Sequence, residues 1–285
     1  MESKKELTDD IGKWSEIKLD IIQGYASLFQ QILSKKFTTI YIDAFAGYGV
    51  HKSKESGVEI EGSPLRALKV NPQFMEYHFI DKDADKVDHL EALINPSDYD
   101  NVRFYTGDCN LVLKKQILPK ITFESFKKAF CVLDPYGMTL DWDTVLACGK
   151  TRATDILINF PIMDMNRNAL RANRETVTEF NEEKMNSFWG NDSWKKIAYP
   201  ETQYELFGED SPTKIKGTVD RILNEYLRRL KEEAGFQCTL KPLPMKNSKG
   251  AVVYYLIFAA NHRKACDAMR YFFRKYGGDE YGSKI

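Results

Sequence analysis

The sequence predicts an α/β fold with a doubly wound, mostly parallel sheet. Short segments rich in β-branched and aromatic residues alternate with helical segments from residue 14 to residue 160. This alternation favours parallel strands joined by right-handed crossovers. A long, polar, helical stretch then follows Pro161, and two more strand-like segments come after it. The predicted strands cover residues 38–45, 77–81, 102–105, 129–134, 155–160, 236–242 and 251–260.

The helices are predicted from apolar spacing and from helix-start signals. Apolar residues recur every three or four positions between residues 14 and 33, which indicates an amphipathic N-terminal helix. Residues 47–62 read as a long polar loop, after which Ser63 and Pro64 suit the start of a helix, with serine as the N-cap. Further helices are expected near residues 82–94, from 110, at 142–148, at 218–234 and at 261–276.

The last two strands fix the predicted architecture. Proline and glycine separate them and no helical pattern fits between them, so they should pair as an antiparallel hairpin. A seven-stranded doubly wound sheet with an antiparallel last strand is the Rossmann-like class I methyltransferase fold, by analogy at the level of the fold. We predict one such domain over residues 1–285, with an N-terminal helix at 12–36 and a helical insertion after strand five at 162–217.

Composition excludes several classes of protein. The 285 residues carry 41 Lys and Arg against 41 Asp and Glu, so no bulk positive charge attracts nucleic acid. No run of about 18 apolar residues occurs, and the polar N-terminus lacks the apolar stretch of a secretory signal. The cysteine number is odd, at five, and no C-x-x-C pair occurs, so we expect no disulfide framework and no zinc site. These features favour a cytoplasmic protein.

Four carboxylates follow four successive predicted strands. They are Asp43, Asp81, Asp108 and Asp134. Doubly wound sheets bind ligands at the carboxyl ends of their strands, so these side chains should surround one site. Helix capping is the alternative for Asp81 and Asp108, and loop capping for Asp43.

The ligand predicted at this edge is S-adenosylmethionine. Gly47 and Gly49 follow Asp43 and allow close backbone approach, but the third glycine of a dinucleotide loop is missing. An acid before the loop would repel a pyrophosphate, whereas the sulfonium and amino groups of S-adenosylmethionine are cationic. Asp81 would accept hydrogen bonds from the ribose, and Asp108 would lie near the adenine.

Asp134, Pro135 and Tyr136 are predicted to hold the methyl acceptor. A carboxylate beside an aromatic ring suits a planar substrate with an exocyclic amine, because the carboxylate accepts the N–H groups while the ring stacks on the base. Such positioning aims the amine lone pair at the methyl carbon. A simple turn after the strand is the alternative, since Pro-Tyr-Gly is a good turn sequence.

The order of motifs along most of the chain resembles the three-Cys-motif partner (TcmP) family. The resemblance rests on Trp14-x-x-x-Lys18-x-x-Ile-Ile22-x-x-Tyr25, Tyr41-Ile-Asp-Ala-Phe-Ala-Gly47, Gly62-Ser-Pro-Leu65, Phe79-Ile-Asp81, Gly107-Asp-Cys-Asn110, Leu133-Asp-Pro-Tyr-Gly137 and Tyr254-Tyr-Leu-Ile-Phe258.

The resemblance implies a methyltransferase fold and a partner protein with a three-cysteine motif. It places Phe45 and Cys109, which lie within these motifs, at the cofactor site. The tetrapeptide Asp134-Pro-Tyr-Gly137 is also similar to the Asp-Pro-Pro-Tyr motif of amino-methyltransferases acting on adenine or cytosine, but it lacks the second proline. By analogy with N-terminal elements of adenine methyltransferases, Lys18 lies over the cofactor cleft. A surface lysine is the alternative.

A basic stripe completes the predicted site. Arg167, Arg171 and Arg174 fall at spacings of four and three, which would align them on one helix face beside the cleft, where they could hold substrate phosphates. A solvated helix face explains the same spacing.

The favoured hypothesis is an S-adenosylmethionine-dependent methyltransferase acting on DNA or RNA bases. A partner protein without this catalysis is one alternative. A magnesium-dependent nuclease or phosphotransferase using Asp43, Asp81 and Asp83 is the other.

Overall fold

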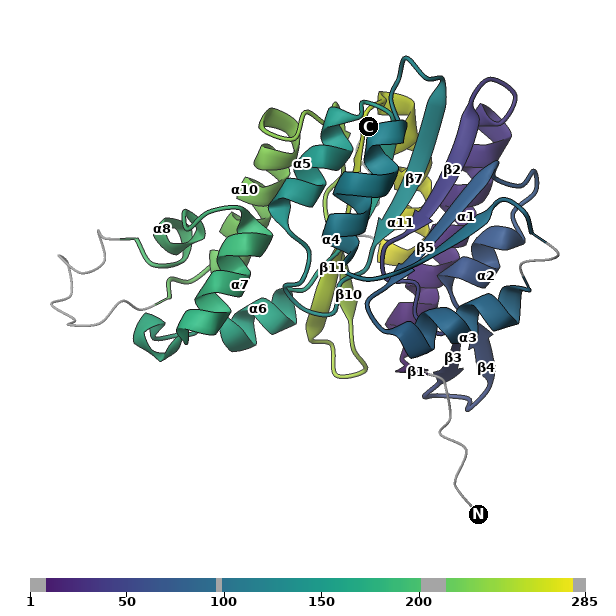
Figure 1. Ribbon diagram of the computed structural model, residues 1–285. Helices are drawn as coiled ribbons and strands as arrows, with labels where there is room; N and C mark the ends of the chain where they lie inside the picture. Colours follow the sequence, from purple (N-terminus) through teal and green to yellow (C-terminus); the bar gives the residue numbers. More distant parts are fainter. Residues whose placement is uncertain (1–8, 96–98, 201–213, 279–285) are drawn as a thin grey trace, which may run out of the picture.

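The computed structural model describes residues 9–95, 99–200 and 214–278 (Figure 1). Within these residues the main sheet has eight strands, in the order β10-β11-β8-β7-β2-β5-β6, with β9 paired to β11. Five neighbouring strands are parallel, in the sheet order β8-β7-β2-β5-β6. Strand β11 runs antiparallel to β8, β9 and β10. The strands are β2 (Thr38–Asp43), β5 (Glu76–Asp81), β6 (Val102–Thr106), β7 (Lys127–Leu133), β8 (Thr154–Phe160), β9 (Cys238–Thr239), β10 (Leu243–Lys246) and β11 (Val252–Ala260).

This strand order confirms the predicted Rossmann-like class I methyltransferase fold. One detail differs, because the strand expected at 236–242 is two short strands, β9 and β10, which raises the strand number from seven to eight. Pro242 lies between them and has no N–H to donate to a neighbouring strand. Pro244 lies within β10, where an edge position tolerates proline.

Helices cover both faces of the main sheet (Figure 1). Alternate residues of each strand point to opposite faces, so that Ile40 and Ile42 join one apolar core while Tyr41 joins the other. The Tyr41 core packs α1, α2, α3 and α11, and the Ile40 core packs α4 to α8 and α10. The helices are α1 (Lys13–Leu33), α2 (Ser63–Leu68), α3 (Ala84–Ile94), α4 (Cys109–Val112), α5 (Trp142–Lys150), α6 (Ile162–Asn168), α7 (Glu179–Trp189), α8 (Trp194–Ala198), α10 (Thr218–Glu232) and α11 (Arg263–Gly277).

Short helical turns complete these elements. A π-helical turn at Leu113–Ile117 and a 3-10 turn at Leu118–Lys120 extend α4, and a second 3-10 turn lies at Arg174–Thr176. The segment predicted as an insertion contains α6, α7 and α8, while its residues 201–213 lie outside the described part. Trp189 and Trp194 are fully buried in the main core, so α7 and α8 pack directly on the sheet layer.

The stretch expected to be a polar loop at 47–62 contains two strands. β3 (Val50–Ser53) and β4 (Glu59–Glu61) form an antiparallel hairpin, and β1 (Asp9–Ile11) pairs parallel to β3. The prediction was wrong because these strands are short and partly exposed, and one partner comes from the N-terminal segment. This three-stranded sheet places Asp9–Ile11 beside the carboxyl ends of the main strands.

The cysteine expectation is wrong for one pair. Cys238 in β9 and Cys266 in α11 form a disulfide. β9 pairs with the end of β11, and α11 begins a few residues later, so the two cysteines meet through tertiary structure that spacing alone does not show. Cys109, Cys131 and Cys148 are unpaired and buried. Because two of the five cysteines form a disulfide, the cysteines no longer favour a reducing compartment.

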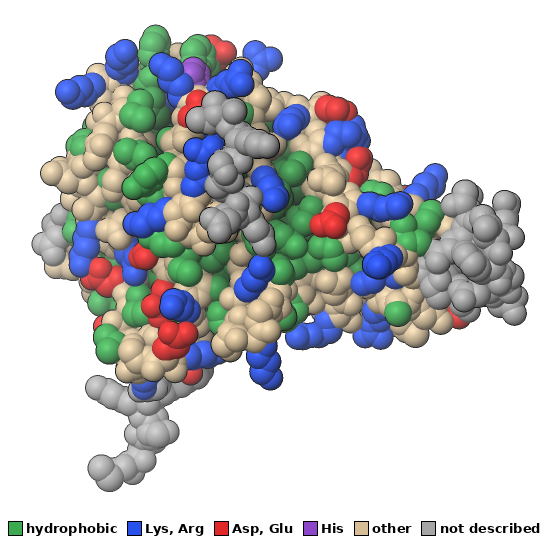
Figure 2. Space-filling model, turned by 180° about the vertical axis from the view of Figure 1, so that it is seen from behind, with side chains coloured by type: hydrophobic (Ala, Val, Ile, Leu, Met, Phe, Trp, Pro, Cys, Tyr) green, Lys and Arg blue, Asp and Glu red, His purple; other side chains and the backbone are tan. Residues whose placement is uncertain are grey.

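The rear face of the molecule carries charged side chains of both signs, interspersed with hydrophobic ones (Figure 2). Across the described ranges, no helix combines the length and apolar character needed to cross a membrane.

Candidate cofactor and acceptor site

A cavity of about 240 Å³ lies at the carboxyl ends of β2, β7 and β8. The Gly47 loop and the turn from Asp134 to Tyr136 line it from the sheet side, and β1 and the first turns of α1 line it from the opposite side. Asn159 at the end of β8 and Tyr254 in β11 complete the wall. Residues from both ends of the chain therefore enclose one space at the edge predicted to bind ligand.

The Gly47 loop leaves open space for a ligand. Gly47 has a φ of +64°, a conformation that favours glycine, and no atom lies within 4 Å of the position a Cβ would take. Its N–H donates to one Asp81 oxygen at 2.9 Å, and the other Asp81 oxygen accepts the N–H of Asp83 at 3.0 Å. Asp81 thus fixes the loop from the neighbouring strand.

Asp43 lies beneath this loop and is fully buried. It accepts hydrogen bonds from the Phe45 N–H at 3.3 Å and the Tyr41 hydroxyl at 3.4 Å, and also from Ser63. Burial raises the pKa of Asp43 to about 6, and the Ser63 hydrogen bond partly opposes that rise. Ser63 is the first residue of α2 rather than its N-cap, which is Gly62.

Asp134 is held by two side chains from distant parts of the sequence. Lys18 of α1 forms an ion pair with one oxygen, and the Asn159 amide donates to the other at 2.6 Å. Burial alone would lower the pKa of Lys18, but the Asp134 charge beside it raises that pKa above its ordinary value. Lys18 is therefore a cation at neutral pH, and it reaches this cavity from α1.

Two polar atoms of the cavity lining have no hydrogen-bond partner within the described residues. They are Nδ1 of His51 and Oδ1 of Asn159, and both are shielded from solvent. Burial lowers the pKa of His51, and the nearby Lys18 charge adds to this, so the imidazole is neutral at pH 7. Buried polar groups are normally paired, so a ligand in this cavity would supply the missing partners.

A small cluster of side chains closes one side of the cavity. Asp9 of β1 accepts a hydrogen bond from the Tyr136 hydroxyl at 3.2 Å and pairs with Lys86 of α3 at 3.3 Å. The Lys86 ammonium also lies 5.3 Å from the centre of the Tyr136 ring. We call Asp9, Lys86 and Tyr136 the clasp, because they join β1, α3 and the turn after β7 at the wall of the cavity.

The structure brings together most of the residues predicted at the site. Lys18, Phe45, Gly47, Asp134, Pro135 and Tyr136 all line the cavity. Asp43 and Asp81 support its floor through the hydrogen bonds described above.

Three residues predicted to bind the cofactor do not line this cavity. The Cβ position of Gly49 faces Leu90, and the Gly49 carbonyl accepts the Gly62 N–H at 2.7 Å, so this glycine shapes the hairpin. Asp108 is exposed and caps α4 by accepting the Asn110 N–H at 2.7 Å. The Cys109 thiol is buried in the Ile40 core, where burial raises its pKa to about 12.

The arginines do not form the predicted helix stripe. Helix α6 ends at Asn168, so Arg167 is in its last turn, Arg171 follows the helix and Arg174 starts a 3-10 turn. Arg171 donates to the carbonyls of Arg167 and Thr176, which ties this connection together. None of the three lines the cavity. The spacing was misleading because α6 is only seven residues long.

The described carboxylates do not support the magnesium alternative. No group of three or more His, Cys, Asp or Glu side chains in the described ranges converges as metal ligands do. Asp83 instead caps α3 by accepting the Asp85 N–H at 3.0 Å, while Asp43 and Asp81 hold the Gly47 loop region.

Sequence reasoning missed Asn159, His51 and Asp9 as site residues. Asn159 lies near the carboxyl end of predicted strand five, so the strand-end rule that selected Asp134 could have selected it too. His51 is in β3, which was not predicted, and Asp9 is far in sequence from the other residues of the cavity. No local sequence pattern marks either residue as part of a site.

No protein-family model matches this sequence, and no curated protein matches it. Several solved structures are similar to this chain at low identity and low TM-score. The methyltransferase domain of a bacterial Hen1 protein has a TM-score of 0.41 and 10% identity, covering 85% of this chain and 99% of its own. Protein LPL1258 from Legionella pneumophila has a TM-score of 0.48 and 10% identity, covering 91% and 92%. A SAM-dependent methyltransferase from Leishmania major has a TM-score of 0.39 and 10% identity, covering 85% and 72%.

Similarity at this level assigns no substrate and no residue role. The resemblance to the three-Cys-motif partner family stays a prediction, as does the partner protein that it implies.

Proposed function

We propose that the protein is an S-adenosylmethionine-dependent methyltransferase that methylates an amino group of a nucleic acid base. The observation that supports this most is the shared cavity. Gly47, anchored by Asp81, and Asp134, anchored by Lys18 and Asn159, line the same enclosed space. A loop suited to a cofactor therefore lies beside a carboxylate suited to an amine.

The residues present fit S-adenosylmethionine. A carboxylate offers about four acceptor positions and Asp81 uses two, so two positions are left for ribose hydroxyls. Lys18 has three donors, of which Asp134 takes one, and the others can hold the carboxylate of the amino acid end. Asp43 and Asp134 contribute negative charge toward the cationic end. When bound, the cofactor supplies an electrophilic methyl group.

Asp134 would orient the acceptor. Its carboxylate accepts hydrogen bonds from an exocyclic amine, and Lys18 and Asn159 prevent it from rotating. Fixing a nucleophile in this way removes orientational freedom before reaction, which contributes several kcal/mol to lowering the barrier. Tyr136 keeps 69% of its surface exposed and could stack on a base once the clasp opens. A duplex base would have to be flipped out to reach the cavity, whereas a single strand needs less distortion.

Calorimetry tests the cofactor half of the proposal. We expect the wild-type protein to bind S-adenosylmethionine and Asp81→Asn to bind it at least about tenfold more weakly, since about 1.4 kcal/mol of ribose contact is lost. Asp83→Asn is the matched control, because it removes a neighbouring carboxylate that caps α3. Equal affinities in all three proteins, or no binding by the wild type, would refute the cofactor site.

Product analysis tests the acceptor half. Wild-type protein is incubated with labelled S-adenosylmethionine and pooled single-stranded RNA and DNA, and the digested nucleosides are separated by mass. The proposal predicts label on an exocyclic amine. Cofactor binding without any labelled nucleoside would exclude nucleic acid bases as the acceptor.

A further inference from the structure

Three shielded polar side-chain atoms have no hydrogen-bond partner in the part of the chain that the structure describes. The hydroxyl of Tyr226 is one of them, and this residue lies in the Ile40 core, where other aromatic rings pack around it. The other two, Nδ1 of His51 and Oδ1 of Asn159, belong to residues that line the 240 Å³ cavity, which we call the inner cavity. Unused hydrogen-bonding capacity is therefore concentrated at the proposed site.

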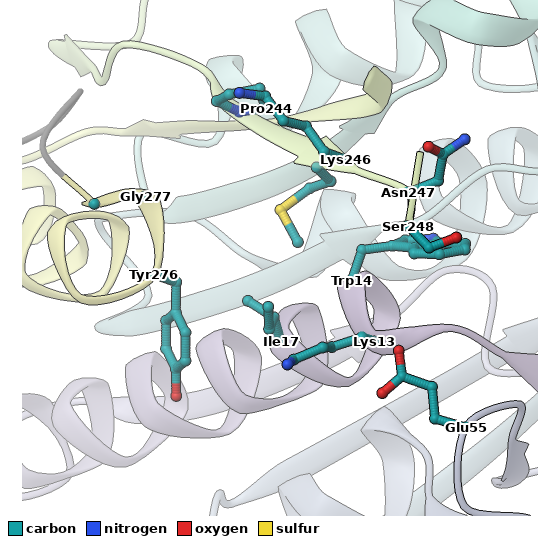
Figure 3. A pocket seen from close by; sticks show the side chains of 12 residues that line it. Lys13, Trp14, Ile17, Glu55, Pro244, Lys246, Asn247, Ser248, Tyr276 and Gly277 are labelled. Atoms are coloured by element: carbon teal, nitrogen blue, oxygen red, sulfur yellow. The ribbon is translucent and has the colours of Figure 1, made fainter. Parts of the chain in front are cut away.

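A larger cavity does not share this feature. The outer cavity, of about 440 Å³, lies between the start of α1, the β10–β11 hairpin and the end of α11, and Trp14 lines both cavities (Figure 3). None of the three atoms belongs to its lining, to which Ile17 and Met245 contribute apolar side chains. Volume alone does not identify a ligand, whereas an unpaired polar atom defines the group that must pair with it. Only the inner cavity therefore specifies part of its ligand.

Asn159 uses half of its amide. Its Nδ2 donates to an Asp134 oxygen at 2.6 Å, while its Oδ1 accepts from no described residue. An ionised carboxylate only accepts hydrogen bonds, so the amide atom beside Asp134 is the nitrogen and the unpaired atom is the oxygen. Asn110, a buried asparagine in α4, differs because its Oδ1 accepts from the Asp141 N–H at 2.9 Å and the Thr144 hydroxyl at 2.8 Å. Asn159 instead keeps an acceptor for a donor that a ligand brings.

Asn159 and Asp134 present two acceptors side by side. Asn159 lies in β8 and Asp134 directly follows β7, and these two strands pair in parallel. The bond between the two side chains holds the amide against the carboxylate, and both residues line the inner cavity. A primary amine carries two N–H donors on one nitrogen and matches such a pair. A secondary amine carries one donor, so one of the two acceptors would face its alkyl group.

Resting on the function proposed above, we propose that Asn159 makes the site specific for a primary exocyclic amine, so that each base receives one methyl group. Asp134 accepts one N–H and Oδ1 of Asn159 accepts the other, which prevents the amine from rotating and leaves the nitrogen lone pair free.

The transfer itself explains the limit of one methyl group. The lone pair forms the bond to the methyl carbon, the electron pair of the carbon–sulfur bond stays on the sulfur, and one N–H proton passes to Asp134 and then to water. The product keeps one N–H for two acceptors. Leaving a buried acceptor unpaired should weaken binding of the methylated base about tenfold.

Fluorescence anisotropy with short labelled oligothymidine and oligouridine strands tests this specificity. Each strand carries one central adenine, cytosine or guanine, whose amine is either unmodified or monomethylated, and the flanking thymine or uracil has no exocyclic amine. We expect the wild-type protein to bind the preferred unmodified strand about tenfold more tightly than its methylated form. Equal binding of both forms by the wild type, or no binding of any strand, would overturn the proposal.

Asn159→Leu separates hydrogen bonding from size. Leucine has nearly the same volume, so a methyl group excluded by size would still be excluded, whereas loss of the acceptor should bring the ratio of the two affinities close to about one. Lys18→Met is the matched control, because it removes the other partner of Asp134 and keeps the Asn159 amide. It should weaken binding of both forms and keep their ratio. A ratio unchanged in Asn159→Leu, or lost equally in both variants, would overturn the role of Asn159.

Product analysis separates this inference from the proposed function. On prolonged incubation with S-adenosylmethionine, the wild type should form monomethylated nucleoside and stop, and Asn159→Leu should react more slowly but form dimethylated nucleoside as well. Dimethylated nucleoside from the wild type refutes the role of Asn159 alone. A preference for the unmodified strand without any methylated product refutes methyl transfer and leaves the recognition of a primary amine standing.

Discussion

The carboxylates of Asp81 and Asp108, which follow β5 and β6, are held in a different way from the carboxylate of Asp134, which follows β7. In the half formed by β2, β5 and β6, Asp81 and Asp108 accept hydrogen bonds from backbone N–H groups, mostly two residues away. In the half formed by β7 and β8, Asp134 is held by the side chains of Lys18 and Asn159, which are 116 and 25 positions away.

This difference separates two kinds of binding. Backbone donors are present whatever the side chains, so the bonds of Asp81 to Gly47 and Asp83 do not depend on the identity of other side chains. The side-chain clamp on Asp134 depends on three elements meeting, and each of its members can be changed. The first arrangement suits a cofactor that does not vary, and the second suits an acceptor whose identity depends on the side chains around it.

Breaking the clamp should have the largest effect. Asp134→Asn keeps the shape of the side chain but removes the charge that pairs with Lys18 and replaces one acceptor with a donor. We expect methyl transfer to fall about thousandfold, or about 4 kcal/mol, because the amine loses its orientation. Initial rates with saturating S-adenosylmethionine measure this.

The control for Asp134→Asn is Asp141→Asn, which changes a carboxylate outside the inner cavity. Its rate should equal the wild-type rate. A separate denaturation curve shows whether Asp134→Asn is folded, since leaving a largely buried lysine unpaired is itself destabilising. A folded Asp134→Asn protein with near-normal rates would remove Asp134 from the proposed chemistry.

Asp43, which is buried, and Asp155, which is half-buried, allow a test of the comparison by changing the pH. Asp43 lies at the carboxyl end of β2, and Asp155 lies near the start of β8, bound to the Tyr25 hydroxyl at 2.9 Å. Burial raises the pKa of each to about 6. The folded state therefore holds these protons more tightly than the unfolded state. Each contribution to stability is present below pH 4 and is lost as pH rises through about 6.

The expected size of this effect follows from the shift. A rise from 3.8 to about 6 corresponds to about 3 kcal/mol for Asp43 between about pH 4 and pH 7. Urea denaturation at both pH values should show that Asp43→Asn and Asp155→Asn each flatten this dependence. Only Asp43→Asn should alter how S-adenosylmethionine affinity varies with pH. Identical pH profiles for cofactor binding in both variants would mean that the protonation of Asp43 does not affect cofactor binding.

The halves also differ in how far the sequence predicts them. Local rules identify Asp81 and the Gly47 loop, because strand ends and glycines are visible in short windows. The same rules gave Asp108 a cofactor role, although its carboxylate caps α4. Asn159 and Asp9 reach the site only through tertiary contacts, and β1 pairs with a strand about forty residues away. The arginine spacing suggested a helix face because no local signal ended α6 at Asn168.

A pair of glycines tests whether the loop in the first half serves a ligand. Gly47 and Gly57 have φ values of +64° and +69°, and neither has an atom within 4 Å of its Cβ position. Alanine at either place should cost about 1 kcal/mol of stability through backbone strain. Only Gly47→Ala should weaken S-adenosylmethionine binding, by about tenfold, because its methyl group enters the space a ligand would fill. Equal cofactor affinities in the two variants would make Gly47 a turn residue only.

The clasp joins the two halves, and opening it should have the smallest effect. Asp9→Ala removes the bonds to Tyr136 and Lys86, so we expect this wall of the 240 Å³ cavity to open more often. Gating of this kind changes rates more than equilibria, and we expect association of S-adenosylmethionine to speed up about threefold with affinity nearly unchanged. Stopped-flow fluorescence measures the rate. Asp10→Ala is the control, because Asp10 also lines the cavity but, among the residues that the structure describes, forms no bond to the clasp. Tyr136→Phe removes the same hydrogen bond from the other side, so its rate gain should not add to that of Asp9→Ala. Additive gains would mean that Asp9 and Tyr136 act separately, and the two halves of the site would then open independently.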